Sequence, residues 1–232
     1  MPEFSLLIPH DTGQPWRQKL VDWCAARWRH HLPEAEVLVA GVGRSPANRS
    51  ANRNLLASLA STDLLAFVDA DVCSAIRAVR NAVELCRTEA LVKFNTVIWV
   101  HKRGTQRLLR TDPAATLAVF PEDIQKVNRP GDLLGLGFFM RREVLEAVNG
   151  WDERFEGWGH EDPSLTHAVE TLVGPTARIA EPAYHLWHPR ETQGGEHDKS
   201  TPGFLARRRL GAKYIAAHGK AQAMRKLVAG CR

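Results

Sequence analysis

Apolar runs of strand length alternate with helix-length segments through the first hundred residues. The runs predict strands at 4–8, 37–42, 64–68 and 91–100, and the segments between them predict helices at about 15–31, 47–59 and 75–87. Strands that alternate with helices of this length indicate βαβ units, in which helices cover both faces of a parallel sheet. We therefore expect an α/β fold with a Rossmann-like, mainly parallel central sheet flanked by helices.

The second half of the chain is less regular. Residues 101–133 contain three prolines and indicate a loop-rich segment, followed by a strand at 134–140 and helices at 142–148 and 161–172. A strand-like run at 179–187 and a basic helix at about 204–228 complete the expected elements. A chain of 232 residues is expected to form one domain. We expect that domain to cover residues 1–198, with a helical tail at 199–232.

The composition excludes several classes of protein. Hydrophobic residues make up 44% of the chain and charged residues 25%, which is typical of a globular domain and not of a disordered or collagen-like chain. No apolar run reaches the roughly 20 residues that span a bilayer, and residues 1–9 do not resemble a signal peptide. The four cysteines have no C-x-x-C spacing, which fits a reducing compartment. We expect a cytoplasmic protein without a transmembrane segment.

The net charge of +5 is unevenly distributed. Residues 199–232 contain nine Lys and Arg and no acid, whereas residues 1–198 contain 22 basic and 26 acidic residues. A mildly acidic body argues against a nucleic-acid-binding face spread over the fold. The tail could still contact an anionic membrane surface or a polyanionic acceptor such as modified DNA.

Two carboxylates follow one of the predicted strands directly. Asp69-Ala70-Asp71 comes after the apolar run Leu-Leu-Ala-Phe-Val, at the carboxyl end of a strand, where ligands bind in α/β sheets. Paired carboxylates suit a hard cation, especially one that bridges diphosphate oxygens. Arg53, on the preceding helix, could balance the charge of a diphosphate. A solvated turn and a solvated arginine would give the same pattern.

Two further motifs carry chemical groups. Gly157-Trp158-Gly159-His160-Glu161-Asp162 places an aromatic ring between glycines, where it could cover a sugar ring, and follows it with acids that could supply a general base. His185 and His188 lie three residues apart. In an extended segment they would lie on opposite faces, so a shared metal requires a turn, or only one of them is a ligand. Both motifs could also be structural: an aromatic plug and packed histidines.

Taken in order, these motifs resemble the GT-A glycosyltransferases, and most closely the catalytic domain of the β-1,4-galactosyltransferases and chondroitin polymerases. The resemblance covers about residues 4–195. It rests on the strand 5–9, the stretch from Asn52-Arg53-Asn54 to Asp69-Ala70-Asp71, the stretch from Asn149-Gly150-Trp151-Asp152 to the Gly157–Asp162 block, and the two histidines. The chain departs from the galactosyltransferases at His10-Asp11-Thr12, where they have an arginine-rich turn, and at Pro163, where they have an acid.

The resemblance implies a metal-dependent, inverting glycosyltransferase. It implies a nucleotide-sugar-binding half at about 1–100, an acceptor-binding half at about 101–198, and a nucleoside-diphosphate-sugar donor, expected to be a UDP-sugar. Its implied roles are metal ligation of Mn²⁺ or Mg²⁺ by Asp71, His188 and His185; donor binding by Pro9, His10, Asp11, Arg53, Asp69 and Ala70; sugar or acceptor binding by Trp158, Gly159 and Glu161; and general-base catalysis by Asp162 with the help of Glu161.

The acceptor stays open: a glycan, a lipid-linked group, a protein or modified nucleic acid would each fit. With no recognisable membrane anchor or stem, a Golgi-type enzyme is not expected. A nucleotidyltransferase is one alternative, although Pro9-His10-Asp11-Thr12-Gly13 is a poor phosphate loop. A nucleic-acid-binding protein that acts through Arg207-Arg208-Arg209 and Lys213 is another, but it leaves the acidic body and the Gly157–Asp162 block unexplained.

Overall fold

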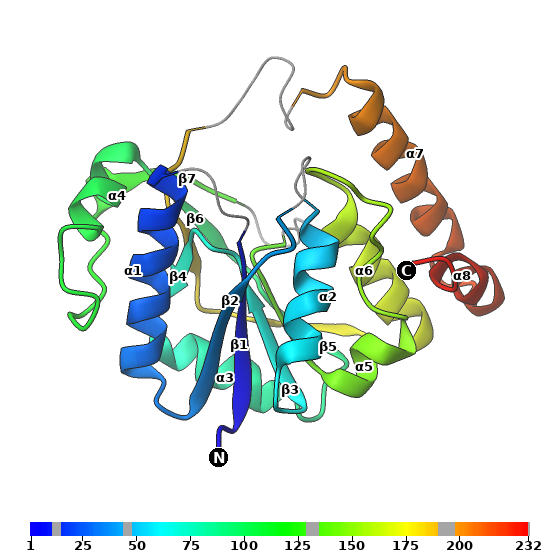
Figure 1. Cartoon of the computed structure of the whole chain (residues 1–232), viewed down its shortest axis with the longest axis horizontal. Coiled ribbons are helices and arrows are strands. Elements are labelled where there is room, and N and C mark those ends of the chain that lie inside the picture. Colours follow the sequence, from blue (N-terminus) through cyan, green and yellow to red (C-terminus); the bar gives the residue numbers. More distant parts are fainter. Residues whose placement is uncertain (11–14, 44–47, 129–134, 190–197, 232) are drawn as a thin grey trace.

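The computed structural model describes all residues except 11–14, 44–47, 129–134, 190–197 and 232 (Figure 1). The strands are β1 (Phe4–Pro9), β2 (Ala35–Ala40), β3 (Leu64–Val68), β4 (Val72–Ser74), β5 (Leu91–Phe94), β6 (Val97–Val100), β7 (Ile124–Val127), β8 (Gly137–Arg141), β9 (Thr176–Ile179) and β10 (Ala183–His185). The helices are α1 (Pro15–His31), α2 (Arg49–Leu59), α3 (Ile76–Leu85), α4 (Lys102–Leu108), α5 (Arg142–Ala147), α6 (Glu161–Leu172), α7 (Pro202–Ala217) and α8 (Ala221–Val228), with a 3-10 turn at Pro121–Asp123.

A six-stranded mixed sheet forms the centre, in the order β2-β1-β3-β8-β5-β9. The pairs β1–β2, β1–β3 and β5–β9 are parallel, whereas β8 runs antiparallel to both of its neighbours. A second sheet of four short strands, in the order β4-β10-β6-β7, adjoins it. The α/β prediction is confirmed, and the reversed strand β8 is what makes the sheet mixed.

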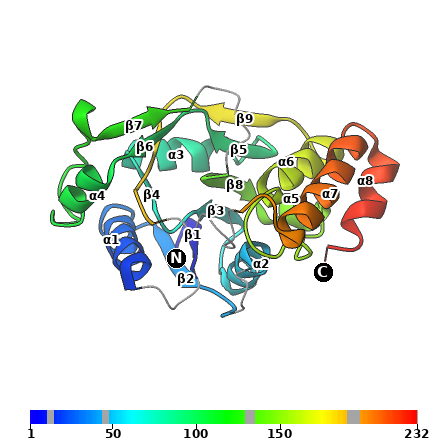
Figure 2. The ribbon, with the colours of Figure 1, turned by 90° about the horizontal axis from the view of Figure 1, so that it is seen from above.

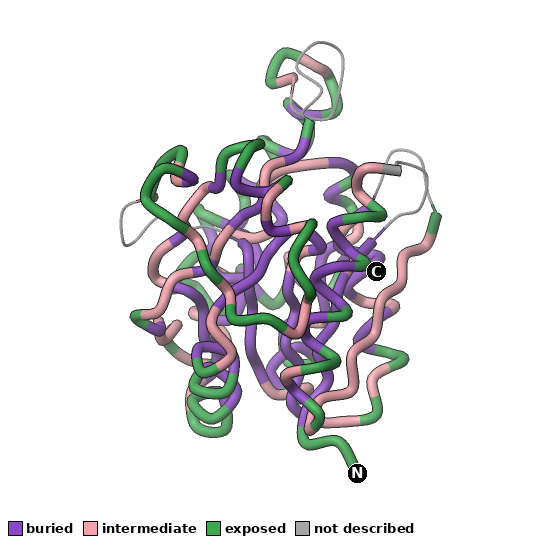
Figure 3. The backbone as a smooth tube through the Cα atoms, turned by 90° about the vertical axis from the view of Figure 1, so that its left-hand side faces the viewer, coloured by how far each residue is buried: buried purple, intermediate pink, exposed green. Residues whose placement is uncertain are grey.

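Helices cover both faces of the central sheet. Apolar side chains of α1 and α3 pack on one face, with Leu6 and Ile8 of β1, and those of α2, α5 and α6 pack on the other, with Leu7 of β1. The alternation along β1 follows from the two-residue period of a strand, which sends successive side chains to opposite faces. Buried segments fill the interior, and exposed segments lie mostly at the outside (Figure 3).

Two segments that were expected to be single strands are each divided between the two sheets. The run 91–100 splits at Asn95-Thr96 into β5 and β6, and the run 179–187 splits into β9 and β10. Both runs pass from the central sheet to the second sheet side by side: β9 pairs with β5 in the central sheet, and β10 pairs with β6 in the second sheet. Apolar content alone cannot reveal such a crossing.

The expected basic helix at 204–228 is two helices, because Gly219 takes a positive φ of 72° between α7 and α8. Both helices pack outside α6 (Figure 2). Tyr214, Met224 and Val228 are buried in the same apolar cluster as residues of α5 and α6. In the expected loop-rich middle segment, the described part contains α4 and β7. Among the residues that the structure describes, no helix has the length and apolarity needed to span a bilayer.

Candidate active site

A cavity of about 390 Å³ opens where β1 and β3 end and α6 begins. Most of the sequence-predicted site residues line it: Pro9, His10, Asp69, Ala70, Asp71, Trp158, Gly159, Glu161, Asp162, His185 and His188. Asp11 lies outside the described residues. Arg53 does not line the cavity, and its side chain is almost completely buried beneath it. The topology thus brings residues from four separate motifs into one space.

Asp71, His185 and His188 form a three-residue cluster whose potential ligand atoms all lie within 4.8 Å of one another. Asp71 Oδ2 is 3.3 Å from His188 Nε2, and Asp71 Oδ1 is 3.9 Å from His185 Nε2. His185 is the last residue of β10, and Leu186 N donates to Asp71 O. Both histidines face the same carboxylate, although they lie three residues apart in the sequence.

The donor set suits a divalent cation. One carboxylate and two imidazoles give three ligands, and the open cavity leaves positions for oxygens of a bound molecule. Burial raises the pKa of Asp71, but the neighbouring His185, His188, Arg17 and Arg49 outweigh burial and leave that pKa below its ordinary value. The carboxylate is therefore ionised, as a metal ligand must be.

Aromatic rings fix the two histidines. Trp99 stacks on His185 with ring centroids 4.1 Å apart, and Trp16 stacks on His188 at 5.3 Å with an interplanar angle of 11°. His188 Nδ1 lies 2.9 Å from the Pro189 carbonyl oxygen, which leaves Nε2 for Asp71. Such outer contacts hold ligating imidazoles in orientation. The sequence signalled Trp16 only as part of an apolar helix face.

Arg53 links the two acidic motifs. Its Nη2 donates to Asp69 Oδ1 at 2.9 Å and its Nη1 donates to Asp162 Oδ1 at 2.8 Å. The guanidinium lies 4.2 Å from the ring centroid of Trp151, which supports it from below. Its contacts are those of a residue that positions two carboxylates. Arg17 and Arg49, which the sequence reasoning missed, are the arginines that line the cavity.

Asp162 is the second residue of α6, and its side chain keeps 20% exposure beside the cavity. Burial raises the pKa of Asp162 to about 7; Arg53 and Lys93 oppose this shift, while Glu161 and Asp69 add to it. A carboxyl that titrates near neutral pH is matched to general-base work. Glu161 is buried, with Oε1 3.6 Å from Arg49 Nη1.

Lys93 is a buried cation behind Asp162 that sequence reasoning missed. Its Nζ donates to Thr166 Oγ1 at 3.2 Å, and Thr166 donates in turn to the carbonyl oxygen of Asp162. Burial lowers the pKa of Lys93 to about 8. The signal was present, because Lys93 interrupts the apolar strand Leu-Val-Lys-Phe.

The loop that carries Trp158 is held by α7. Gly157, Gly159 and His160 have φ values of 83°, 106° and 74°, so the chain turns sharply on both sides of the ring. Arg207 of α7 donates through Nε to Trp158 O and through Nη1 to Glu156 O. Phe204 of α7 packs against Trp158 with ring centroids 6.3 Å apart and also lines the cavity. The predicted tail thus contributes a wall of the site.

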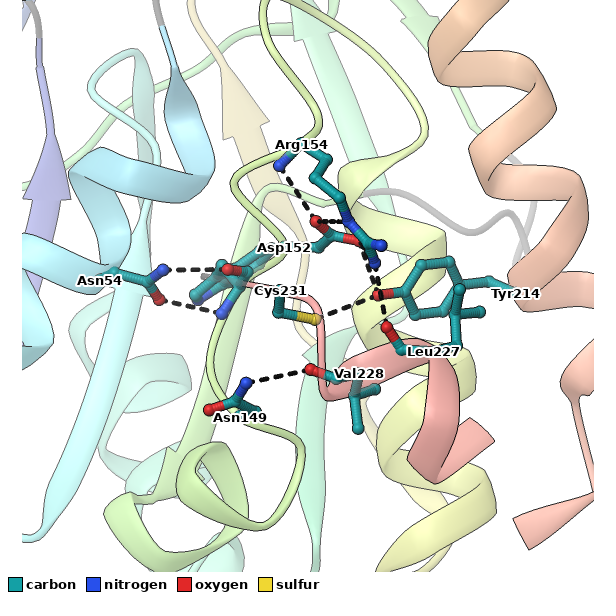
Figure 4. Close-up of polar contacts among 9 residues, drawn as sticks. Asn54, Asn149, Asp152, Arg154, Tyr214, Leu227, Val228 and Cys231 are labelled. Carbon is teal, nitrogen blue, oxygen red and sulfur yellow. Dashed lines mark hydrogen bonds and ion pairs between the residues drawn. The ribbon is translucent and has the colours of Figure 1, made fainter. Parts of the chain in front are cut away.

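The Asn149–Asp152 segment, part of the predicted acceptor block, supports the site from outside the cavity lining (Figure 4). Asn54 donates to Trp151 O and accepts from Trp151 N, both at 2.9 Å. Asp152 accepts hydrogen bonds from Arg154 and from the Tyr214 hydroxyl of α7. These contacts fix Trp151 beneath Arg53.

Gly135 is a further residue that the sequence reasoning missed. A Cβ atom at this position would lie 1.6 Å from Asp162 Oδ2, so only glycine fits here. Gly135→Ala should displace the carboxylate and lower turnover by about 100-fold, the cost of a misplacement of about 1 Å. Steady-state kinetics would measure this loss.

Gly174→Ala is the matched control, because its new methyl would meet only the Ala90 methyl, at 3.3 Å. Equal turnover in wild type and Gly135→Ala would show that the Asp162 carboxylate is not held where the structure places it.

Comparisons with known proteins identify the fold. The catalytic domain of Drosophila β1,4-galactosyltransferase 7, solved with xylobiose, superposes with a TM-score of 0.54 and 16% identity over 90% of this chain and 80% of its own. GalNAc-T7 with UDP, GalNAc and Mn²⁺ gives 0.55 and 11% over 97% of this chain and 54% of its own. This is the GT-A fold.

A third GT-A structure, residues 1–349 of S. aureus TarS with UDP-GlcNAc, gives a TM-score of 0.52 and 15% identity over 98% of this chain and 70% of its own. Neither protein-family models nor curated protein sequences match the chain. The fold expected from the motif resemblance is confirmed. Sequence identities this low show the fold alone, so the roles of individual residues have to be argued from the geometry of the site.

Proposed function

We propose that the protein is a metal-dependent, inverting glycosyltransferase that moves a sugar from a nucleoside diphosphate to an acceptor hydroxyl. The observation that carries the proposal is that one cavity of a GT-A fold holds both the Asp71–His185–His188 cluster and Asp162, a carboxyl whose pKa is raised. The cluster supplies a cation site, and Asp162 supplies a base.

In this proposal Asp71, His185 and His188 would hold Mn²⁺ or Mg²⁺, and the ion would supply positive charge to stabilise the diphosphate as a leaving group. Arg17 and Arg49 line the same cavity and would add positive charge for phosphate oxygens. These two arginines take the place that the sequence analysis gave to Arg53, whose own contacts are with Asp69 and Asp162.

Asp162 takes the proton of the acceptor hydroxyl while that oxygen attacks the anomeric carbon. The new carbon–oxygen bond forms on the face opposite the breaking bond to the diphosphate, so the anomeric configuration inverts. Glu161 Oε2 is buried and has no hydrogen-bond partner among the described residues, which suits it to accept a hydrogen bond from a sugar hydroxyl. Asp69 faces the same cavity and is proposed to contact the ribose or donor sugar.

Pro9 and His10, at the end of β1, are proposed to contact the nucleotide together with Ala70. Asp11, which was predicted to join them, lies outside the described residues. The identity of the nucleotide as uridine is supported by solved proteins of the same fold, whose structures contain UDP or UDP-GlcNAc. The proposed acceptor side is the wall formed by Trp158, Gly159 and Phe204.

A screen of nucleotide-sugars for Mn²⁺-dependent hydrolysis tests the proposal without knowledge of the acceptor. We expect release of a nucleoside diphosphate from one donor or a small group of donors. Release of pyrophosphate from a nucleoside triphosphate, with no turnover of any nucleotide-sugar, would identify a nucleotidyltransferase instead.

Trp158→Ala should weaken binding of the nucleotide-sugar by about tenfold, because it removes a ring expected to pack on the sugar. Binding of the free nucleoside diphosphate should not change, since the diphosphate site lies at Asp71. Calorimetric titration of both ligands measures the difference. Phe120→Ala is the matched control, because Phe120 is an exposed aromatic residue that does not line the cavity. Equal weakening of both ligands by Trp158→Ala would exclude a sugar-specific contact.

A further inference from the structure

A second cluster of metal-binding side chains lies where α6 meets α7. His167 and Glu170 are one turn apart on α6 and therefore share a face. His218 directly follows α7, and its ring centroid is 4.7 Å from that of His167. His218 Nε2 lies 3.3 Å from Glu170 Oε2, and one potential ligand atom of each residue lies within 4.8 Å of the other two.

An ion pair between His218 and Glu170 explains only part of this cluster. It does not account for the second imidazole, that of His167, which packs against the imidazole of His218. His167 Nδ1 is buried without a hydrogen-bond partner among the described residues. Burial lowers the pKa of His167, and the neighbouring His218 lowers it further. The unpaired Nδ1 of His167 is a nitrogen that could bind a metal ion.

The cluster has the ligand types of a zinc site and is open to solvent. Two imidazoles and one carboxylate are a donor set that Zn²⁺ takes with water in the fourth position. His218 is 45% exposed and Glu170 27% exposed, so an ion and its water can enter. Tetrahedral bonds of 2.0–2.1 Å place ligand atoms about 3.3 Å apart. His218 Nε2 and Glu170 Oε2 already have that separation, and the potential ligand atoms of all three residues lie within 4.8 Å of one another.

We propose that His167, Glu170 and His218 bind a borderline transition-metal ion such as Zn²⁺, at a site distinct from the Asp71 cluster. None of the three lines the cavity, so the site does not depend on the proposed sugar transfer. An ion here joins the end of α7 to α6. Because α7 also holds the Trp158 loop through Arg207, the ion would stabilise the docking of a cavity wall.

The test measures Zn²⁺ binding in untagged, metal-free protein that carries His185→Ala and His188→Ala, so that the Asp71 cluster cannot contribute. Calorimetric titration should show one Zn²⁺ per chain, with a rise in Tm. Adding His218→Ala should weaken binding by more than about tenfold, and Glu170→Gln should do the same. Co²⁺ should give the intense visible absorption of a four- or five-coordinate nitrogen site, and lose it in either variant.

His101→Ala is the matched control, since His101 is exposed and lies at the start of α4. It should leave the titration unchanged. Glu170→Gln keeps the proposal testable if His218→Ala lowers stability. Absence of stoichiometric Zn²⁺ binding in the double-variant background would overturn the proposal. So would binding that survives both His218→Ala and Glu170→Gln, or that His101→Ala removes equally.

Discussion

Asp162→Asn should reduce sugar transfer by about 10²- to 10⁴-fold, the range over which a positioned general base contributes. Asparagine keeps the shape of the side chain and can still accept from Arg53, but it cannot take a proton. Affinity for the nucleoside diphosphate should stay within about twofold, because this ligand binds at Asp71 in the proposed mechanism. Single-turnover transfer rates and calorimetric titration separate the two effects.

The pH profile supplies a second signature of the same variant. The active form of Asp162 is the carboxylate, and burial raises its pKa to about 7, with Glu161 and Asp69 adding to the shift and Arg53 and Lys93 opposing it. Wild-type kcat/KM should therefore rise as the pH passes through about 7, and this limb should be missing from the residual activity of Asp162→Asn.

Asp63→Asn is the matched control, because the Asp63 side chain is 94% exposed and lies outside the cavity. It should behave as wild type. Loss of nucleotide binding in Asp162→Asn would assign a structural role to the Arg53–Asp162 ion pair in place of catalysis. An unchanged transfer rate would remove Asp162 from the mechanism.

Asp71→Ala should abolish donor turnover, with a loss of about 10³-fold or more, because it removes the only anionic ligand of the cluster and with it the charge stabilisation by the metal. Chelation of the wild type should have the same effect, and added Mn²⁺ should restore the chelated wild type but not the variant. Binding of Mn²⁺, measured by electron paramagnetic resonance, should fall in parallel.

His185→Ala and His188→Ala test whether both imidazoles are ligands. Each should weaken Mn²⁺ binding, since both Nε2 atoms face the Asp71 carboxylate. Asp63→Ala should leave Mn²⁺ binding intact. Full turnover in chelated protein, or in Asp71→Ala, would show that the reaction does not use the metal.

The positions of the acidic residues at strand ends and helix starts could be predicted from the sequence, because each depends only on its neighbours in the chain. Asp69 and Asp71 come directly after an apolar strand, and Glu161 and Asp162 start an amphipathic helix at the predicted residue. Strand ends and helix starts meet at one edge of an α/β sheet, so their proximity could be expected. The resemblance of the ordered motifs then indicated the fold.

Features that depend on contacts between distant segments could not be predicted in this way. The spacing of His185 and His188 left open whether both face one carboxylate, and their common approach to Asp71 is a tertiary contact. The close approach of Gly135 to Asp162 is a tertiary contact with no local pattern. The role of α7 as a cavity wall was hidden because its basic residues suggested a separate tail.

Burial of the Asp162 carboxyl lowers the stability of the folded protein in the ionised state that the proposed reaction needs. In an unfolded chain this group has a pKa of about 3.9, whereas burial raises it to about 7 in the folded protein. Between these values the folded state binds the extra proton, so the free energy of unfolding declines as the pH rises through this window. Above about 7 the folded protein carries the full cost of an ionised, poorly hydrated carboxylate. In this proposal Asp162 therefore contributes least to the stability of the folded protein at the pH at which it is the most effective base.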